Sequence, residues 1–317
     1  MIRYEYYLFK GGAYKKEKLN EYLEDVGGLI ILESKVVHEL IITLAVPVEE
    51  EDRLNEIAKE LKANLIKTPL IGTEIAVVAP SMSRKHLPHP VCDIAEYLRR
   101  YGAKTNLVGL SRGAGQKGGL SPKEKRLIGE HDLAVLVLGN FKYCLQECKS
   151  SLYEELETPT VIVGGPIQIN VPNPHLYVGG LGRVNHRLRK GEEIQKLEEI
   201  VKAATLLIGR IREEQSHDPP AVNPLIVMKS IIEQMPEVLD QPSPTPLTLK
   251  LDGLRIKLPY ENYVDKVRKV NLEGDLSLEE IAEIKKTSFS DYILVKVLPE
   301  SEVSLPERHI YSCKGLG

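Results

Sequence analysis

Hydrophobic positions recur with two different periods in the first seventy residues, and the period changes from segment to segment. Alternating or continuous hydrophobic residues predict strands at Tyr4–Phe9, Leu29–Leu32, Leu40–Val46 and Asn64–Ile66. Hydrophobic residues spaced three and four apart predict helices at Lys16–Leu23 and Glu50–Leu61. The resulting order, βαββαβ, is that of a ferredoxin-like α+β unit, which we assign to residues 1–71.

From about residue 72 the pattern changes to short hydrophobic strands that alternate with amphipathic helices. The predicted strands are Ile75–Ala79, Thr105–Leu110, Leu133–Leu138 and Thr160–Val163. The predicted helices are Cys92–Arg100, Ser121–Gly129, Lys142–Leu156 and the long Glu192–Glu214. Such alternation predicts a mostly parallel, Rossmann-like sheet with helices on both faces, formed by residues 72–216.

The last third of the chain mixes both kinds of element. Residues 217–246 predict a short helix at Leu225–Met235 and a proline-rich linker at Gln241–Pro246. Two short strands then flank Asp252–Gly253, a residue pair typical of a tight hairpin, and a helix at Leu276–Ile284 and a strand at Tyr292–Leu298 follow. Residues 247–317 are therefore predicted to be a small α+β unit with a polar tail, and the fold class of the whole chain is α/β.

Composition and charge narrow the function classes. The net charge of −3 gives no reason to expect nucleic acid or an anionic membrane as a partner. No hydrophobic run is long enough to cross a bilayer, so we expect a cytoplasmic protein. Four cysteines in 317 residues are too few for a disulfide scaffold, which leaves thiols, metal ligands or buried core residues.

The turn after the first strand of the second unit carries the most concentrated chemistry. His86, His89 and Cys92 are spaced three apart, and Pro88 and Pro90 restrict the backbone between them. Cys92 falls at the start of a predicted helix, where unpaired N–H groups and the helix dipole favour a thiolate. The pattern predicts a site for a metal, a cluster or a reactive thiol. The alternative is an exposed, proline-stiffened loop with a buried cysteine.

Cys144 and Cys148 lie one helical turn apart, on one face of a predicted helix. This spacing suits two ligands of a metal or cluster, or a redox pair in a thiol–disulfide enzyme. Two cysteines on the core side of a helix are the structural alternative. Cys313, in the polar tail, is either a further ligand or an exposed thiol.

A glycine-rich loop, with Gly113, Gly115, Gly118 and Gly119, follows the second strand of the parallel sheet. It contains the glycine spacing of a dinucleotide-binding loop, which would make the chain a nucleotide or metabolite sensor on a Rossmann-like fold. However, the glycines stop before Ser121 begins the next helix. A loop beside the site is the other interpretation. The chain has no P-loop, so we do not expect it to be an ATPase itself.

The segment Arg84–Ile94, with its His-x-x-x-Pro-Val-Cys core, resembles the methyl-coenzyme M reductase operon protein C family. Weaker similarities to that family lie at Leu107–Leu110, Leu133–Asn140 and Thr160–Val163. With its N-terminal unit and C-terminal extension, the chain as a whole resembles the methanogenesis marker protein 7 family.

This resemblance implies a non-catalytic subunit in the ATP-dependent reductive activation of methyl-coenzyme M reductase, whose nickel tetrapyrrole works only when reduced. The implied cofactor is a complex iron–sulfur cluster that relays low-potential electrons. Cys92 and His86 carry the motif and are the first ligand candidates, whereas His89, Cys144 and Cys148 are added from this chain alone.

Because the chain has no four-cysteine set of the usual spacing, we expect the cluster to be shared with a partner subunit. The expected partners are methyl-coenzyme M reductase, its operon protein C, other methanogenesis marker proteins and an ATPase subunit, with no nucleic acid and no membrane.

Overall fold

The computed structural model describes residues 4–12, 16–36, 39–80, 90–110, 118–181, 190–243, 245–272 and 276–303. The described residues form two compact units, one within residues 1–71 and one within residues 72–303. None of the helices within the described ranges is long and apolar enough to cross a membrane.

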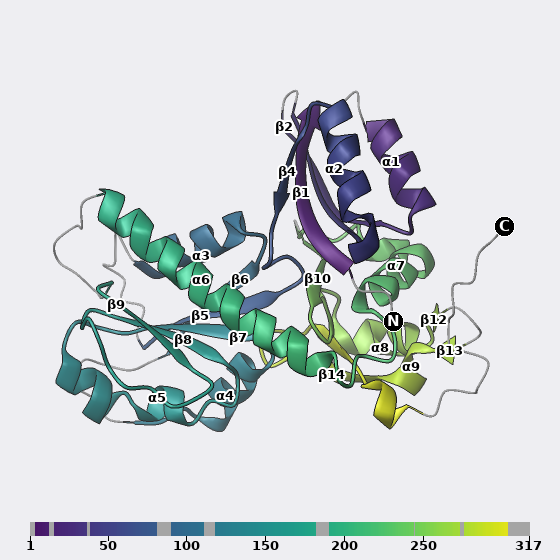
Figure 1. The fold of residues 1–317 in the computed structure, drawn as a ribbon. Coiled ribbons are helices and arrows are strands. Elements are labelled where there is room, and N and C mark those ends of the chain that lie inside the picture. Colours follow the sequence, from purple (N-terminus) through teal and green to yellow (C-terminus); the bar gives the residue numbers. More distant parts are fainter. Residues whose placement is uncertain are drawn as a thin grey trace. The chain divides into compact units, whose positions relative to one another are not determined.

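The N-terminal unit is an antiparallel sheet with two helices. Its elements are β1 (Tyr4–Gly12), α1 (Lys16–Asp25), β2 (Leu29–Val36), β3 (Glu39–Pro47), η2 (Val48–Glu50), α2 (Glu51–Glu60) and β4 (Asn64–Lys67). The strand order is β2-β3-β1-β4, which is a ferredoxin-like arrangement (Figure 1). Tyr7 and Phe9 lie on the sheet face that packs against the hydrophobic side of both helices, so this face forms the core of the unit.

The second unit contains the parallel sheet that the sequence predicts. Its strands are β5 (Glu74–Ala79), β6 (Lys104–Gly109), β7 (Leu133–Val137), β8 (Thr160–Gly164) and β9 (Leu176–Gly179), in the order β6-β5-β7-β8-β9. All four strand pairs are parallel. Every residue of β5, β7 and β8 is buried, as expected for strands covered on both faces.

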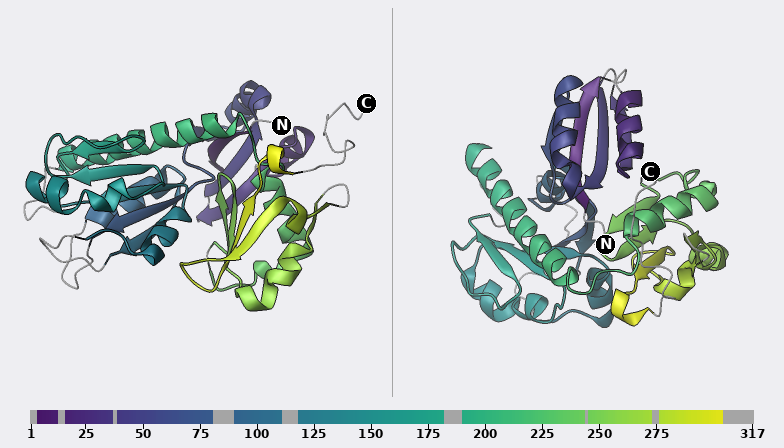
Figure 2. Two further views of the ribbon diagram at one scale, coloured as in Figure 1. Left: turned by 90° about the horizontal axis from the view of Figure 1, so that it is seen from below. Right: turned by 45° about the vertical axis from the view of Figure 1, so that its right-hand side comes forward.

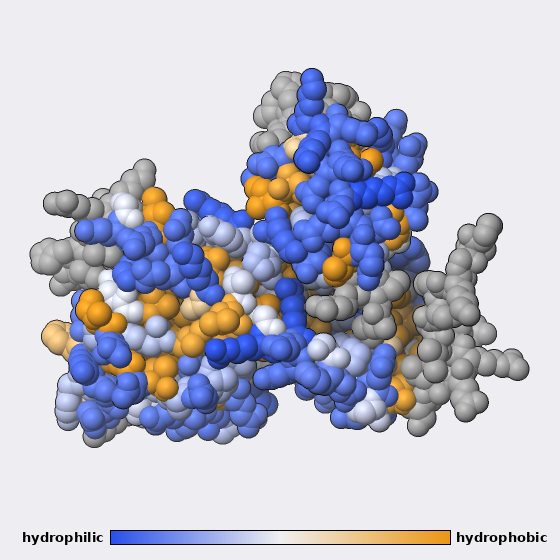
Figure 3. Space-filling model, in the orientation of Figure 1, coloured by the Kyte–Doolittle hydropathy of each residue, from blue (hydrophilic) through white to orange (hydrophobic). Residues whose placement is uncertain are grey.

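Helices cover both faces of this sheet. The helices α3 (Pro90–Arg100) and α6 (Lys190–Gln215) pack on one face, and α4 (Pro122–Gly129) and α5 (Ser151–Glu154) pack on the other (Figure 1). Ser121 caps α4 with a capping box, as its sequence indicates. Figure 3 shows hydrophobic areas among hydrophilic ones on the part of the surface that carries α6, where Ile194 and Leu206 are exposed.

The same unit continues into an antiparallel sheet. Its elements are α7 (Pro224–Gln234), η4 (Pro236–Val238), β10 (Leu247–Lys250), β11 (Gly253–Ile256), α8 (Tyr260–Arg268), β12 (Asn271–Leu272), β13 (Leu276–Ser277), α9 (Leu278–Ile281), β14 (Ala282–Lys286), β15 (Ile293–Val297) and η5 (Glu300–Glu302). The strand order is β10-β11-β15-β14, and Figure 2 shows these strands in green and yellow as a sheet separate from the parallel one. The α/β class with a parallel sheet is confirmed.

Two predicted helices differ from the structure, and two elements were not predicted. The predicted helix Leu276–Ile284 is divided among β13, α9 and β14, because the chain leaves the short α9 to pair with β15. The predicted helix Lys142–Leu156 is interrupted at Lys149, between a π-helix and α5. The sequence analysis also missed β9 and α8.

The hairpin between β10 and β11 turns one residue earlier than predicted. Lys250 pairs with Gly253, so Leu251 and Asp252 are the turn residues. Gly253 instead begins β11, where a Cβ atom would collide with the carbonyl oxygen of Val295. The glycine is therefore required by close strand packing and not by the conformation of the turn.

Candidate functional site

The strand order of the parallel sheet defines where a ligand would bind. From β5 the chain crosses to β6 on one side, and from β7 it crosses to β8 on the other, although β5 and β7 are neighbours. In an open parallel sheet, ligands bind outside the carboxyl ends of the strands at such a switch point. The segments that follow β5 and β7 therefore form the candidate site.

Cys92 lies in the first turn of α3, on the segment that follows β5, and it is exposed. Val91 and Ile94, on either side of it, are buried and hold this turn against the sheet. The position agrees with the sequence analysis, which placed Cys92 at a helix start. His86 and His89 lie outside the described residues.

Cys144 and Cys148 lie on the segment that follows β7, within a five-residue π-helix, η3 (Cys144–Cys148). Both thiols are half-buried, free of disulfides and about one turn apart. Leu145 between them is fully buried, and its backbone N–H donates to the carbonyl of Phe141 at 3.1 Å. The buried leucine therefore fixes the segment while the cysteines stay partly accessible, and π-turns of this kind are frequent at functional sites.

The end of β8 is shaped to receive this cysteine segment. A Cβ atom on Gly164 would lie 2.6 Å from Leu145 Cδ2, and a Cβ atom on Gly165 would lie 2.8 Å from Asn140 Cα. The N–H of Gly165 donates to the carbonyl of Gly139 at 3.0 Å, which joins the two loops. Two consecutive glycines thus let the segment after β7 lie directly on the segment after β8.

Three large hydrophobic side chains are exposed on these two loops. Phe141 and Tyr143 are 77% and 70% exposed, and Ile167, on the loop after β8, is 84% exposed. These three side chains lie on the loops that follow β7 and β8, beside the half-buried cysteines.

The available ligands fit an iron–sulfur cluster in kind but not in number. Cys92, Cys144 and Cys148 supply thiols from two neighbouring strands, the ligand type that such clusters require. In the part of the chain that the structure describes, no three His, Cys, Asp or Glu side chains are placed to hold a metal ion. Further ligands would have to come from another chain or from His86, His89 and Cys313, which all lie outside the described residues.

Two of the four glycines predicted to bind a nucleotide, Gly118 and Gly119, precede α4, and the other two, Gly113 and Gly115, lie outside the described residues. A Cβ atom on Gly119 would lie 2.8 Å from Glu155 Oε2. That carboxylate is the flexible end of a part-exposed side chain and could move aside, so packing does not by itself require glycine here. Nucleotide binding by the loop stays a prediction.

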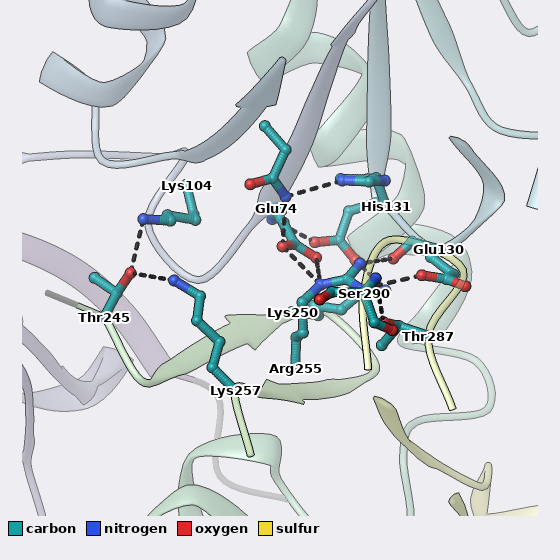
Figure 4. Close-up of polar contacts among 12 residues, drawn as sticks. Glu74, Lys104, Glu130, His131, Thr245, Lys250, Arg255, Lys257, Thr287 and Ser290 are labelled. Atoms are coloured by element: carbon teal, nitrogen blue, oxygen red, sulfur yellow. Dashed lines mark hydrogen bonds and ion pairs between the residues drawn. The ribbon is translucent and has the colours of Figure 1, made fainter. Parts of the chain in front are cut away.

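The sequence analysis missed a buried ionic cluster at the amino ends of the same strands (Figure 4). Arg255 of β11 donates from Nε to both carboxylate oxygens of Glu74, at 2.9 and 3.0 Å, and from Nη1 to Glu130 Oε2 at 3.0 Å. Burial is the largest single effect on Glu74 and raises its pKa, but Arg255, His131 and Lys250 together hold the pKa of this carboxyl below its usual value.

Neighbouring polar groups in the cluster are also paired. Asn106 Nδ2 lies 2.7 Å from Glu74 Oε1 and 3.0 Å from His131 Nε2, and His131 Nδ1 lies 3.0 Å from the carbonyl of Leu127. An amide nitrogen only donates, so His131 accepts at Nε2 and is neutral. Burial lowers the pKa of His131, in agreement with this tautomer.

The buried pair Asp132 and Lys250 fastens the β10–β11 hairpin to the sheet. Asp132 accepts the backbone N–H of Glu74 at 2.7 Å and that of Leu251 at 3.2 Å, and Lys250 Nζ lies 3.4 Å away. Burial raises the pKa of Asp132 to about 6, with Lys250 opposing this effect, so the carboxylate is still mostly charged at neutral pH. The cluster therefore holds the hairpin against the amino ends of β5 and β7.

The fold and the site define an α/β protein of the doubly wound class, with accessible thiols at the switch point of its parallel sheet. The chain belongs to the methyl-coenzyme M reductase operon protein C family, whose family model matches residues 4–270.

Two relatives and one solved structure illustrate the similarity. The uncharacterized protein MJ0094 of Methanocaldococcus jannaschii is 48% identical over 304 residues, which is 96% of each chain. Methyl-coenzyme M reductase I operon protein C of the same organism is 32% identical over 104 residues, covering 29% of this chain and 52% of that one. A formyltetrahydrofolate deformylase from Pseudomonas putida aligns over 63% of this chain and 56% of that one, with 9% identity and a TM-score of 0.25.

Proposed function

We propose that this protein acts in methanogenesis, as a subunit of the assembly that reductively activates methyl-coenzyme M reductase at the expense of ATP. Membership of the operon protein C family, across residues 4–270, supports this role. Within the family we assign the chain to methanogenesis marker protein 7, a cytoplasmic and non-catalytic subunit. The other members of the assembly would be the reductase, its operon protein C, further marker proteins and an ATPase subunit.

In this proposal the carboxyl edge of the parallel sheet holds a complex iron–sulfur cluster. The observation that carries it is the emergence of Cys92 and the pair Cys144 and Cys148 from the neighbouring strands β5 and β7, at the switch point. His86 and His89, which precede Cys92 in the sequence, and Cys313 are further candidates in this chain. The bound cluster would relay low-potential electrons towards the nickel centre.

The cluster is shared with a partner subunit. The three thiols within the described residues are fewer than the ligands of a common four-thiolate cluster. The exposed side chains Phe141, Tyr143 and Ile167 lie on the loops beside the thiols, where a partner would shield the cluster from water. Contact and ligation would then occur on one surface, and the isolated chain would hold the cluster poorly.

The test is to measure iron and acid-labile sulfide in the assembly isolated without oxygen from its native host. We expect several irons and sulfides per copy, with a sharp loss in Cys92→Ala and in the double variant Cys144→Ala, Cys148→Ala. Asp93→Ala is the matched control, because Asp93 is the exposed neighbour of Cys92 in the same helical turn.

Two results would contradict the proposal. Full iron and sulfide content in the Cys92→Ala assembly would remove Cys92 as a ligand. Iron and sulfide at background level in an intact, active assembly would exclude a cluster on this chain altogether. A variant that loses iron because it no longer assembles is recognised by the absence of the partner subunits in the isolated material.

A further inference from the structure

A second group of polar side chains lies beside the ionic cluster and plays no part in the proposed activation role. Lys104 begins β6, Lys257 follows β11, and Ser243 and Thr245 belong to the proline-rich segment predicted to be a linker. Figure 4 shows both lysines pointing towards Thr245. All four residues lie in the unit of residues 72–303.

Both lysines donate to the same hydroxyl. Lys104 Nζ lies 2.7 Å from Thr245 Oγ1, and Lys257 Nζ lies 3.2 Å from the same oxygen. Lys257 Nζ also lies 2.9 Å from Ser243 Oγ, which accepts the N–H of Thr245 at 3.4 Å. The N–H of Lys257 in turn donates to the carbonyl of Pro246 at 2.9 Å, so the segment is held in place and is not a free linker.

This group of four side chains has more hydrogen-bond donors than acceptors. An ammonium has three N–H groups and no acceptor, and a hydroxyl has one O–H and two lone pairs. Thr245 Oγ1 and Ser243 Oγ each accept two bonds, so each hydroxyl hydrogen remains to be donated outward. Lys104 uses one of its N–H groups on these oxygens and Lys257 uses two. The group therefore keeps several N–H and O–H donors that bind no acceptor among the described residues.

Positive charge also exceeds negative charge around the two lysines. Among the residues that the structure describes, no carboxylate lies within 4.0 Å of either ammonium group. Glu74 is the acidic group that acts on both lysines, but Arg255 already binds both of its oxygens. Burial and the charge of Arg99 lower the pKa of Lys104, and burial and the charge of Lys104 lower that of Lys257. Two half-buried like charges therefore lie beside the same hydroxyl, and Glu74, whose oxygens Arg255 already binds, offsets them only in part.

We propose that Lys104, Lys257, Ser243 and Thr245 form a binding site for a tetrahedral oxyanion group, a phosphate or a sulfonate carried by a small molecule. Two ammonium groups provide the charge, and the two hydroxyls donate to further oxygens of the same group. A tetrahedral group offers more acceptor oxygens to these converging donors than a carboxylate does. Binding at this site is independent of any cluster at the carboxyl edge.

A purely structural role for the two lysines makes a different prediction. If they only held the segment around Thr245, replacing either one by glutamine would lower the melting temperature and leave added anions without effect. In an anion site, the same replacement removes one of two neighbouring positive charges. The anion-free variant should then melt at or above the wild-type temperature, and it should lose the stabilisation that the anion gives.

The experiment is calorimetric titration of the full chain with inorganic phosphate, methanesulfonate and acetate, at constant ionic strength set with chloride. Phosphate and methanesulfonate distinguish the two sources of the group, and acetate tests the preference for a tetrahedral anion. The variants are Lys104→Gln, Lys257→Gln and Thr245→Val. Lys229→Gln is the matched control, because Lys229 is an exposed lysine of α7 in the same unit.

We expect saturable binding of phosphate, methanesulfonate or both, and weaker binding of acetate. Each lysine variant should weaken the affinity by about tenfold and Thr245→Val by a smaller factor, in line with the loss of one charge-assisted bond. Lys229→Gln should bind like the wild type. Equal affinity in the lysine variants, or no saturable binding of any of the three anions to the wild type, would overturn the proposal.

Discussion

The buried arginine of β11 offers the sharpest test of how the second unit is held together. Arg255 and Glu74 are each only 1% exposed, and their ion pair joins strands that are 181 residues apart in sequence. Replacing Arg255 by methionine keeps much of the side-chain volume but removes every hydrogen-bond donor. Glu74 and Glu130 would then lose their principal cation inside the protein.

The loss of stability in Arg255→Met is limited by the cost of protonating Glu74. A carboxyl with an ordinary pKa of 4.5 can escape burial as an ion by taking up a proton. At pH 7 this costs about 3.4 kcal/mol, since each pKa unit corresponds to about 1.36 kcal/mol. This agrees with the loss of about 3–5 kcal/mol expected when one partner of a buried ion pair is removed. Near pH 5 protonation costs only about 0.7 kcal/mol, so the loss should shrink.

The sign of the pH dependence is also fixed. The folded-state pKa of Glu74 lies below 4.5, so the pair stabilises the wild type above that pH and the contribution is lost as the pH falls through the folded value. Arg255→Met should therefore be much less stable than wild type at pH 7 and only slightly less stable near pH 5. The stability of Arg255→Lys at pH 7 should lie between those of the wild type and Arg255→Met. Lysine keeps the positive charge but lacks the planar group that contacts both carboxylates.

The assay is unfolding in urea, monitored by hydrogen exchange with mass spectrometry. This method measures the unfolding of β5 and β11 separately from that of the N-terminal unit. Arg268→Met is the control, because Arg268 makes an exposed ion pair with Asp265 and should cost no more than about 1 kcal/mol. Adding Glu74→Gln to Arg255→Met should restore part of the loss. A loss below about 1 kcal/mol for Arg255→Met at pH 7 would refute the reasoning.

Three further predictions concern the carboxyl edge. Leu145→Ala should lower the free energy of unfolding by about 2–5 kcal/mol, which urea unfolding would measure. It should also reduce the iron content of the assembly although every cysteine remains, which iron analysis would check. Gly164→Ala should cost about 1–3 kcal/mol because its Cβ would lie 2.6 Å from Leu145 Cδ2, whereas Gly139→Ala, with no atom within 4 Å, should stay within about 0.5 kcal/mol of wild type. Burial raises the pKa of Tyr177 from 10.0 to about 12, so it favours folding below pH 10 and this contribution is lost as the pH rises towards 12. Tyr177→Phe should therefore remove one late-ionising phenol from the absorbance titration.

Much of the fold could be predicted because the deciding signals are local. The strands β5, β7 and β8 are continuous hydrophobic runs, and Ser121 begins α4 with a capping box that its four-residue pattern already indicates. The strand β9 was missed because it is only four residues long and ends in a glycine, and Val178 is its one buried residue, so neither alternation nor a long hydrophobic run marks it.

The ionic cluster could not be predicted, because no local pattern marks it. In β11 the alternation Leu-Arg-Ile suggests that Arg255 faces solvent, yet all four residues of this strand are buried. Its partners lie at the starts of other strands, more than a hundred residues away. In the same way, the prolines around Thr245 indicate extended chain, but nothing in their composition shows that two lysines would bind it.

The two edges of the parallel sheet differ in a way that limits where partners can act. At the amino ends of β5 and β7, Asp132 and Glu74 bind the β10–β11 hairpin, and their polar atoms are used up within the chain. At the carboxyl ends, Cys92 and Phe141 remain exposed on segments that leave the same two strands. A partner that needs unpaired ligands can therefore find them at the carboxyl edge, whereas a change at Arg255 should alter stability without changing which thiols are accessible. Iron bound per folded assembly should consequently stay constant in Arg255→Met and fall in Cys92→Ala.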